Sequence, residues 1–284
     1  MFNRERHVVL ILLFFILSFF IGANGKHFVL VHGAGHGAWC WYKVATMLKS
    51  AGHNVTTIEL AACGISPIQV QEIHSSISKY HEPLISFIES LPPKEKVILV
   101  GHSFGGIPLS VAMEKFPKKI SLAVFVTAFV ISENLNFTSL LQENQRRLNS
   151  SQQDPPQLVF SDGPNSPPTG LLFGSKLLAS NLYQLSPNED LTLGSSLVRP
   201  HPIFNDEKLI LKETRVTKLR NGRVPKVFII SKGDIFIRED LQLWIIERTG
   251  PYVEVKVIKD SDHMVMFSKP KKLTSHILRS AHKY

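Results

Sequence analysis

The chain has 284 residues, of which 44% are hydrophobic and 19% are charged, and its 32 basic and 23 acidic residues give a net charge of +9 at pH 7. This composition is typical of one soluble globular domain and excludes disordered and fibrous classes. The basic residues are scattered and no nucleic-acid motif is present, so we expect no nucleic-acid partner. No His, Cys or Asp cluster has the spacing of metal ligands, so we expect neither a metal nor a cofactor.

The first 25 residues have the pattern of a secretory signal peptide. Two arginines precede an apolar block from Val8 to Phe20, and the small residues Ala23 and Gly25 follow it. The block is shorter than the roughly 20 residues that span a bilayer. We therefore predict that residues 1–25 are cleaved and that the protein is secreted. A retained N-terminal anchor in the membranes of the secretory pathway is the alternative.

Secretion would expose the glycosylation sequons to modification and the cysteines to an oxidising compartment. The sequons begin at Asn54, Asn136 and Asn149. Cys40 and Cys63 could pair in an oxidising compartment, but two cysteines in a chain of this length form no disulfide framework. We expect them to be unpaired packing residues.

The mature chain opens with a predicted strand from His27 to His32, followed by the glycine-rich loop Gly33–Gly37 and a helix from Ala38 to Val44. The glycine spacing fits neither a dinucleotide-binding loop nor a P-loop. A loop of this kind can instead supply a backbone N–H to an oxyanion hole. We assign that role to the N–H of Ala34, and we expect His32 and His36 to shape the loop.

The central motif is Gly101-His102-Ser103-Phe104-Gly105. A strand from Asn54 to Leu60 and a helix from Ile68 to Ser90 precede it, and the buried strand Lys96–Val100 leads into it. A helix follows at once, and strand, sharp turn and helix form the context of a nucleophile elbow. Ser103 is therefore the candidate nucleophile. The N–H of Phe104 would complete the oxyanion hole, and His102 would pack beside the elbow.

The predicted strands alternate with helices, the next strand running from Ile120 to Phe129. This order predicts an α/β fold with a mostly parallel central sheet flanked by helices. From Ser132 to Pro202 the chain is rich in Asn, Gln, Ser and Pro, with short helical pieces such as Leu171–Leu185 and no strand pattern. We predict that residues 132–202 are an inserted cap and that residues 26–131 and 203–284 form the core.

The core resumes with the strand Lys226–Ser231, a helix, the strand Tyr252–Ile258 and a final helix from Lys271. Asp234 follows the first of these strands and His263 follows the second. In this class of fold the nucleophile, the acid and the histidine come in that order along the chain. We therefore predict a triad of Ser103, Asp234 and His263.

Four segments resemble the plant methylesterases of the α/β-hydrolase superfamily, a group that also contains the α-hydroxynitrile lyases. They are His27–Ala34, Gly101–Gly106, Ser195–Pro200 and Asp262–Met264. The resemblance runs from Lys26 to Tyr284 and carries the triad onto the three residues above. It implies hydrolysis of methyl jasmonate, methyl salicylate or methyl indole-3-acetate, hence a small methyl ester as partner. A homodimer is kept as an alternative to a monomer.

Apolar residues suggest a substrate site, and the resemblance indicates the competing functions. We expect an apolar, uncharged cavity beneath the cap, lined by Gly33, Phe129, Phe173, Leu197 and Met264. Members of the family usually start near Lys26 and are cytosolic, so the leader is a departure. Lyases of the group typically have Thr at the position of Gly33 and Lys at that of Met264. A hydroxynitrile lyase and a non-catalytic hormone-binding protein are the alternatives to an esterase.

Overall fold

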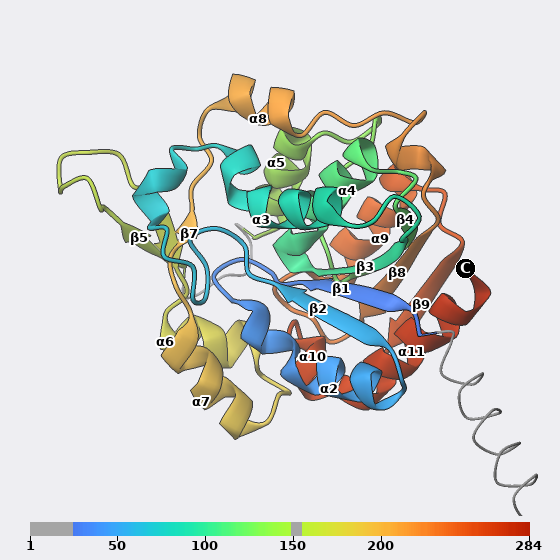
Figure 1. Cartoon of the computed structure of the whole chain (residues 1–284). Coiled ribbons are helices and arrows are strands. Elements are labelled where there is room, and N and C mark those ends of the chain that lie inside the picture. The colour runs from blue at the N-terminus through green and yellow to red at the C-terminus, as the bar shows by residue number, and fades with distance from the viewer. Residues whose placement is uncertain (1–24, 149–154) are drawn as a thin grey trace, which may run out of the picture.

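The computed structural model describes residues 25–148 and 155–284 (Figure 1). The predicted signal peptide, apart from Gly25, lies outside the described residues, and so does the sequon at Asn149. No helix in the described part of the chain is both long enough and apolar enough to cross a membrane.

The centre of the molecule is a six-stranded sheet in the order β2-β1-β3-β4-β8-β9, and every neighbouring pair is parallel. The strands are β1 (His27–Val31), β2 (Asn54–Ile58), β3 (Val97–His102), β4 (Ile120–Val126), β8 (Lys226–Ser231) and β9 (Glu254–Ile258). All six residues of β3 and of β8 are buried, as expected for strands covered on both faces. The predicted α/β class is confirmed.

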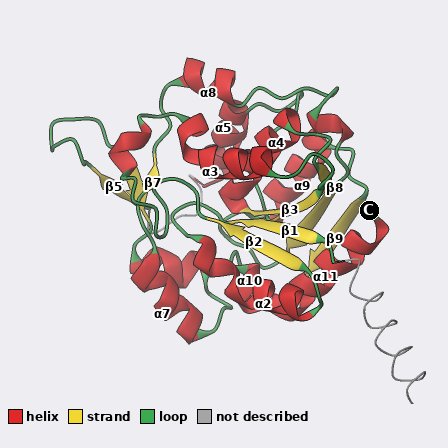
Figure 2. Cartoon of the chain, viewed as in Figure 1, coloured by secondary structure: helices red, strands yellow, loops and turns green. Residues whose placement is uncertain are grey.

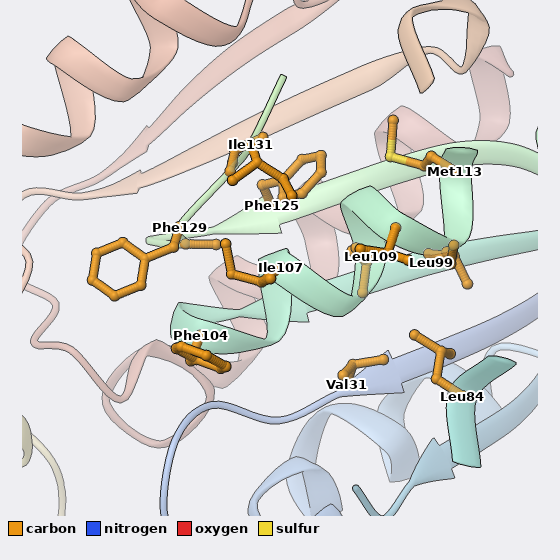
Figure 3. Packing of buried hydrophobic residues seen from close by; sticks show 14 of the residues in the cluster. Val31, Leu84, Leu99, Phe104, Ile107, Leu109, Met113, Phe125, Phe129 and Ile131 are labelled. Carbon is orange, nitrogen blue, oxygen red and sulfur yellow. The ribbon is translucent and has the colours of Figure 1, made fainter. Parts of the chain in front are cut away.

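Helices cover both faces of this sheet and create two hydrophobic layers (Figure 1). One layer contains α3 (Ile77–Ser90), α4 (Gly106–Lys115) and α9 (Glu239–Thr249), and the other contains α2 (Tyr42–Ser50), α10 (Val265–Ser268) and α11 (Pro270–Lys283). Side chains alternate along each strand. Leu99 therefore packs in the first layer and Val100 in the second. Figure 3 shows part of the first layer, with Phe104 and Phe129 at one end of it.

The segment from Ser132 to Pro202 contains a second sheet, which the sequence did not predict. Its elements are α5 (Phe137–Leu148), β5 (Gln157–Val159), β6 (Gly170–Leu172), α6 (Ser175–Leu177), a π-helical turn (Leu178–Leu182), α7 (Asn188–Leu197) and β7 (His201–Pro202), and α8 (Glu207–Glu213) follows. Strands β5, β6 and β7 pair antiparallel, apart from the central sheet (Figure 2). The predicted helical piece at Leu171–Leu185 was wrong at its start, because Leu171 and Leu172 belong to β6. Strands of two or three residues are too short to show an alternating pattern.

Several other helices and strands begin or end at residues that differ from the predicted ones. The helix expected from Ile68 begins only at Ile77, after a short 3-10 turn (Val70–Ile73) and two residues, His74 and Ser75, with positive φ. Ser76 caps α3 by accepting a hydrogen bond from the N–H of Lys79. The helix expected from Ala38 starts as a 3-10 turn (Ala38–Trp41), and the strands expected to reach Leu60 and Phe129 end at Ile58 and Val126.

The cysteines are unpaired, as predicted. Cys40 and Cys63 are both fully buried and free. Cys40 packs in the layer of α2 and α11, whereas Cys63 packs in the layer of α3 and α4. The sheet separates them.

Candidate active site

Ser103 lies at the sharp turn between β3 and α4, as the motif predicts. Its φ is +53°, a conformation that non-glycine residues rarely adopt. The turn is possible because its neighbours lack side chains. A Cβ at Gly105 would lie 2.5 Å from the carbonyl oxygen of His32, and one at Gly101 would lie 2.9 Å from that of Gly105. The backbone therefore holds the Ser103 hydroxyl at the carboxyl end of β3.

The structure brings Ser103, His263 and Asp234 together. The Nε2 atom of His263 lies 3.0 Å from Oγ of Ser103, and its Nδ1 atom lies 2.7 Å from Oδ2 of Asp234. All three side chains are almost fully buried. Asp234 follows β8 and His263 follows β9, so neighbouring parallel strands deliver them to the same edge of the sheet.

Two supporting residues were not predicted in these roles. Thr127, just after β4, donates from Oγ1 to Oδ2 of Asp234 at 2.5 Å. His102, expected only to pack beside the elbow, donates from Nε2 to the backbone oxygen of His263 at 2.8 Å. Burial holds the pKa of His102 well below its ordinary value, so this ring is neutral. The position of Thr127, at the end of the strand that pairs with β8, could have predicted a contact with Asp234.

The backbone N–H groups of Phe236 and Ile237 complete the surroundings of Asp234. Each donates to Oδ1 at 2.8 Å. The carboxylate therefore accepts four hydrogen bonds, two on each oxygen, which fix its orientation.

The glycine-rich loop after β1 packs directly on the serine. A Cβ at Gly33 would lie 2.8 Å from Cβ of Ser103, so only glycine leaves that approach open. His32 accepts from the N–H of Leu60 through Nε2 at 3.1 Å and donates from Nδ1 to the carbonyl of Gly33 at 2.8 Å. Nδ1 of His36 lies 2.9 Å from the carbonyl oxygen of Ala34. The prediction that these two histidines shape the loop is confirmed.

His36 also joins this loop to the segment between α5 and β7. Its Nε2 atom lies 2.8 Å from the hydroxyl of Tyr183. Burial lowers the pKa of His36 to about 3, so the ring is neutral and Nε2 accepts the Tyr183 proton.

Further hydrogen bonds attach the same segment to the site. The N–H of Arg199 donates to the carbonyl of Gly35 at 2.9 Å. Oδ2 of Asp262, the residue before His263, accepts from the N–H of Leu185 at 2.9 Å and from Oγ of Ser186 at 2.7 Å. The segment is thus bonded to both loops that flank Ser103.

Four of the five predicted substrate-contacting residues lie near the triad. Gly33 touches Ser103 as described, the N–H of Phe129 donates to the carbonyl of Ser103 at 3.0 Å, and buried Met264 follows His263. A Cβ at Gly35 would lie 2.9 Å from the ring of Phe173, so that ring covers the glycine-rich loop. Leu197 does not join them. Its side chain is 40% exposed and lines a surface hollow with Trp39 and Tyr42.

No group of three or more His, Cys, Asp or Glu side chains that could hold a metal ion occurs among residues 25–148 and 155–284. The arrangement present is a hydroxyl, an imidazole and a carboxylate in hydrogen-bonded series. Such a series activates a serine for attack on an acyl carbon.

Comparison with known proteins gives consistent results. A sequence model described as "Alpha/beta hydrolase family" matches residues 28–275. The chain is 51% identical over 259 residues to methyl jasmonate esterase 1 of Vitis vinifera, covering 91% of this chain and 98% of that protein. It is 44% identical over 261 residues to salicylic acid-binding protein 2 of Nicotiana tabacum, covering 92% and 99%.

A solved structure is also similar. Tomato methylketone synthase I in complex with 2-tridecanone superposes with a TM-score of 0.84 at 43% identity, covering 92% of this chain and 99% of that one.

Proposed function

Because the chain belongs to the alpha/beta hydrolase family, and within it to the plant methylesterases, we propose that it is a serine carboxylesterase acting on methyl esters of small plant hormones. Methyl jasmonate, methyl salicylate and methyl indole-3-acetate are the candidate substrates, and the products are the free acid and methanol. The observation that carries the proposal is the hydrogen-bonded series from Ser103 through His263 to Asp234.

The mechanism follows from this geometry. Nε2 of His263 takes the proton of Ser103 as Oγ attacks the ester carbonyl carbon. Asp234 accepts from Nδ1–H, which keeps Nε2 free as the base and stabilises the imidazolium that forms. His263 then gives the proton to the departing methanol. Water, activated by the same histidine, releases the acid and restores Ser103.

The N–H groups of Ala34 and Phe104 are the proposed oxyanion hole. Ala34 follows Gly33, which contacts Ser103, and Phe104 follows Ser103 in the chain at the start of a helical turn. Donors placed where negative charge develops stabilise the tetrahedral intermediate. The loss of one such donor typically lowers turnover by about 10²–10³.

Apolar side chains support a neutral ester as the substrate. Phe104, Phe129 and Phe173 are each 6% exposed and Met264 is fully buried. None of these side chains offers a charge to a carboxylate, and burying an unpaired carboxylate costs several kcal/mol. The ester should bind and the acid product should leave. We further propose that residues 132–202 form the cap, since Arg199, Leu185 and Ser186 bond to the loops beside Ser103.

The lyase alternative is not favoured. A lysine near the leaving group would stabilise cyanide, but Met264 occupies that position and offers only apolar contact. A threonine in place of Gly33 would put its Cβ within 2.8 Å of Cβ of Ser103. A non-catalytic hormone-binding protein would need none of the four hydrogen bonds that fix Asp234.

A turnover assay tests the proposal. The panel contains the three methyl esters and mandelonitrile, and wild type is compared with Ser103→Ala. We expect hydrolysis of at least one ester by wild type, no release of cyanide, and no hydrolysis by Ser103→Ala. Ser110→Ala is the matched control, because it removes a buried hydroxyl that bonds only within α4 and to the backbone of Ile131. Cyanohydrin cleavage faster than ester hydrolysis would overturn the assignment.

We also propose that the protein is secreted, on the basis of the pattern in residues 1–25. Asn54 and Asn136 are exposed, as an acceptor of N-glycosylation must be. Protein isolated from a plant host should begin near Lys26 and carry glycan on at least one sequon. An intact Met1 with no glycan would contradict secretion, and retention of residues 1–25 with glycan would indicate the membrane anchor.

A further inference from the structure

A single peptide group separates the side chain of His32 from one donor of the proposed oxyanion hole. The carbonyl of Gly33 and the N–H of Ala34 belong to that group, lie in one plane and point in opposite directions in a trans peptide. The Nδ1 atom of His32 lies 2.8 Å from the carbonyl oxygen of Gly33. A bond at this oxygen therefore acts on the N–H at the other end of the same group.

The backbone determines which nitrogen of His32 carries the proton. The N–H of Leu60 can only donate, and it donates to Nε2 at 3.1 Å. Nε2 is therefore the acceptor, and Nδ1–H donates to Gly33. Oε1 of Glu59 lies 3.4 Å from Nε2 but accepts from the N–H of Ala38 at 3.0 Å. Burial is the main cause that lowers the pKa of His32, so the ring is neutral.

The peptide group after Gly33 needs an anchor of this kind. A Cβ at Gly33 would meet that of Ser103, so a larger residue cannot stiffen the loop at this position. Glycine lets the group rotate at little cost. Rotation would break the bond to His32 and turn the N–H of Ala34 away from the substrate oxygen. Because His32 is fully buried, water cannot replace the broken bond.

We propose that His32 is a positioning residue for the oxyanion hole, an inference that rests on the proposed function. Its Nδ1–H fixes the direction of the Ala34 N–H and makes it a stronger donor, because hydrogen bonds in series polarise one another. The benefit is greatest when the substrate oxygen is negative, so it stabilises the tetrahedral intermediate more than the bound ester. His36 bonds to the next carbonyl, whose peptide group carries the N–H of Gly35 instead.

Two substitutions separate the roles of the two ring nitrogens. In His32→Asn the amide nitrogen stands near the position of Nδ1 and keeps the donor to Gly33. In His32→Gln the amide oxygen stands near the position of Nε2 and keeps only the acceptor for Leu60. The cost of His32→Asn should therefore fall on thermal stability, and that of His32→Gln on turnover.

We expect His32→Gln to lower kcat about tenfold with little change in KM, a fraction of the 10²–10³ that loss of a whole oxyanion donor costs. His32→Asn should stay within about threefold of the wild-type kcat. His81→Gln is the matched control and should keep the wild-type kcat. His81 is also a fully buried histidine, but it lies in α3, and neither of its ring nitrogens has a hydrogen-bond partner in the described part of the chain.

A pair of ketones shows whether the effect is confined to the oxyanion. Oγ of Ser103 adds to the carbonyl carbon of trifluoroacetophenone, its proton passes to Nε2 of His263, and the ketone oxygen becomes an oxyanion. Acetophenone has the same ring but is not activated for addition, so its inhibition reports binding alone. We expect His32→Gln to weaken inhibition by trifluoroacetophenone about tenfold and to leave inhibition by acetophenone unchanged.

Equal losses of inhibition by both ketones in His32→Gln would overturn the proposal, since they would indicate a general change of the pocket. Wild-type inhibition by trifluoroacetophenone in His32→Gln would also overturn it, as would a folded His32→Asn that loses as much turnover as His32→Gln. Thermal unfolding shows which variants fold, and the two ketones on His32→Gln decide the question if His32→Asn does not. A wild type that binds trifluoroacetophenone but hydrolyses no methyl ester would refute the proposed function alone.

Discussion

Thr127 supports the triad through one side-chain contact, the hydrogen bond that it donates to Asp234. Its hydroxyl shares Oδ2 of Asp234 with Nδ1 of His263. Its φ of +37° is one that β-branched residues rarely adopt, and it aims Oγ1 at the carboxylate. Because Asp234 orients the imidazole, a change at Thr127 reaches Ser103 through three successive hydrogen bonds, from Thr127 to Asp234, to His263 and to Ser103.

Thr127→Val should therefore lower kcat by about tenfold to a hundredfold, since a buried hydrogen bond to a charged group contributes about 1.5–3 kcal/mol. KM should change little, because Thr127 does not face the substrate. Thr192→Val is the control, since Thr192 is exposed and bonds only within α7. An unchanged kcat would show that the carboxylate holds its orientation without Thr127.

Met264 allows a second test at the scale of one side chain. Met264→Lys would bury an ammonium group beside His263, where it can pair with the carboxylate of the product. Ester turnover should fall and inhibition by the free acid should strengthen, by about tenfold or more for a buried charge pair. Met264→Leu should keep the wild-type ester turnover and the wild-type inhibition by the free acid. If the acid inhibits both variants equally, Met264 does not face the substrate.

The residues that carry the triad were predictable because each follows a strongly patterned strand. Ser103 stands in a five-residue motif, and Asp234 and His263 occupy loops after apolar runs. Thr127 and His102 were not predicted as supports because the sequence does not show which partner a threonine at a strand end, or a histidine inside the motif, will bond. Leu197 was placed among the substrate contacts because it is apolar, but the side chain lies at the end of α7 and is 40% exposed.

At the scale of elements, the loop between β9 and α10 does two things at once. It carries His263, and through Asp262 it holds the chain just before α7. Burial raises the pKa of Asp262, and the hydrogen bonds from Ser186 and Leu185 oppose that rise. The proposed cap is thus hydrogen-bonded to Asp262, the residue next to the proposed base His263.

Removing one of these ties should loosen the proposed cap without disturbing the base. Ser186→Ala should speed backbone hydrogen exchange in residues 183–186, and kcat/KM should fall by less than about tenfold, the value of one net hydrogen bond. Ser180→Ala is the matched control, because Ser180 is exposed and its hydroxyl bonds only to Lys176 and Asn181 in the preceding helical turns. Equal hydrogen exchange in the two variants would show that the hydrogen bond from Ser186 to Asp262 does not hold the proposed cap in place.

Element by element, the sequence predicted those that repeat a strong pattern and missed those that tertiary contacts impose. The buried strands and the helices α3, α4, α9 and α11 were found, whereas α5 and α7 were not predicted. The sheet of β5, β6 and β7 was missed because no strand in it exceeds three residues. The helix before the elbow was extended too far because Val70 and Ile73 have helical spacing, although the positive φ angles of His74 and Ser75 separate them from α3.

In the molecule as a whole, the parallel sheet brings the triad together at the carboxyl ends of its strands, and the fold also buries several histidines. Burial is the main cause that lowers the pKa of His36, His81 and His201, each to about 3. An unfolded histidine has a pKa of about 6.5. Between these values the unfolded chain binds protons that the folded chain does not, so folding loses stability as the pH falls.

Acid should therefore unfold the protein steeply. Each of the three histidines contributes about 1.4 kcal/mol per pH unit below about pH 6.5, and their joint effect of about 4 kcal/mol per unit is large against a total stability of about 5–15 kcal/mol. Urea titrations from pH 7 to pH 5 measure this slope. His81→Leu should reduce the slope by about 1.4 kcal/mol per pH unit, the contribution of one buried histidine. The substitution breaks no hydrogen bond, since neither ring nitrogen of His81 has a partner in the described part of the chain.

The exposed His282 provides the comparison, and His282→Gln should keep the wild-type slope. A stability that is flat from pH 7 to pH 5 would mean that these rings take up protons in the folded protein.

The sheet separates Cys40 from Cys63, so each thiol can report when its own hydrophobic layer becomes accessible to solvent. Burial raises the pKa of Cys40 well above its ordinary value and that of Cys63 to about 12, so neither thiol reacts while it is enclosed. A thiol reagent would label each cysteine only when its own layer parts. Labelling of both at one rate would indicate that the molecule opens as a unit, whereas two rates would rank the layers by how often each admits solvent.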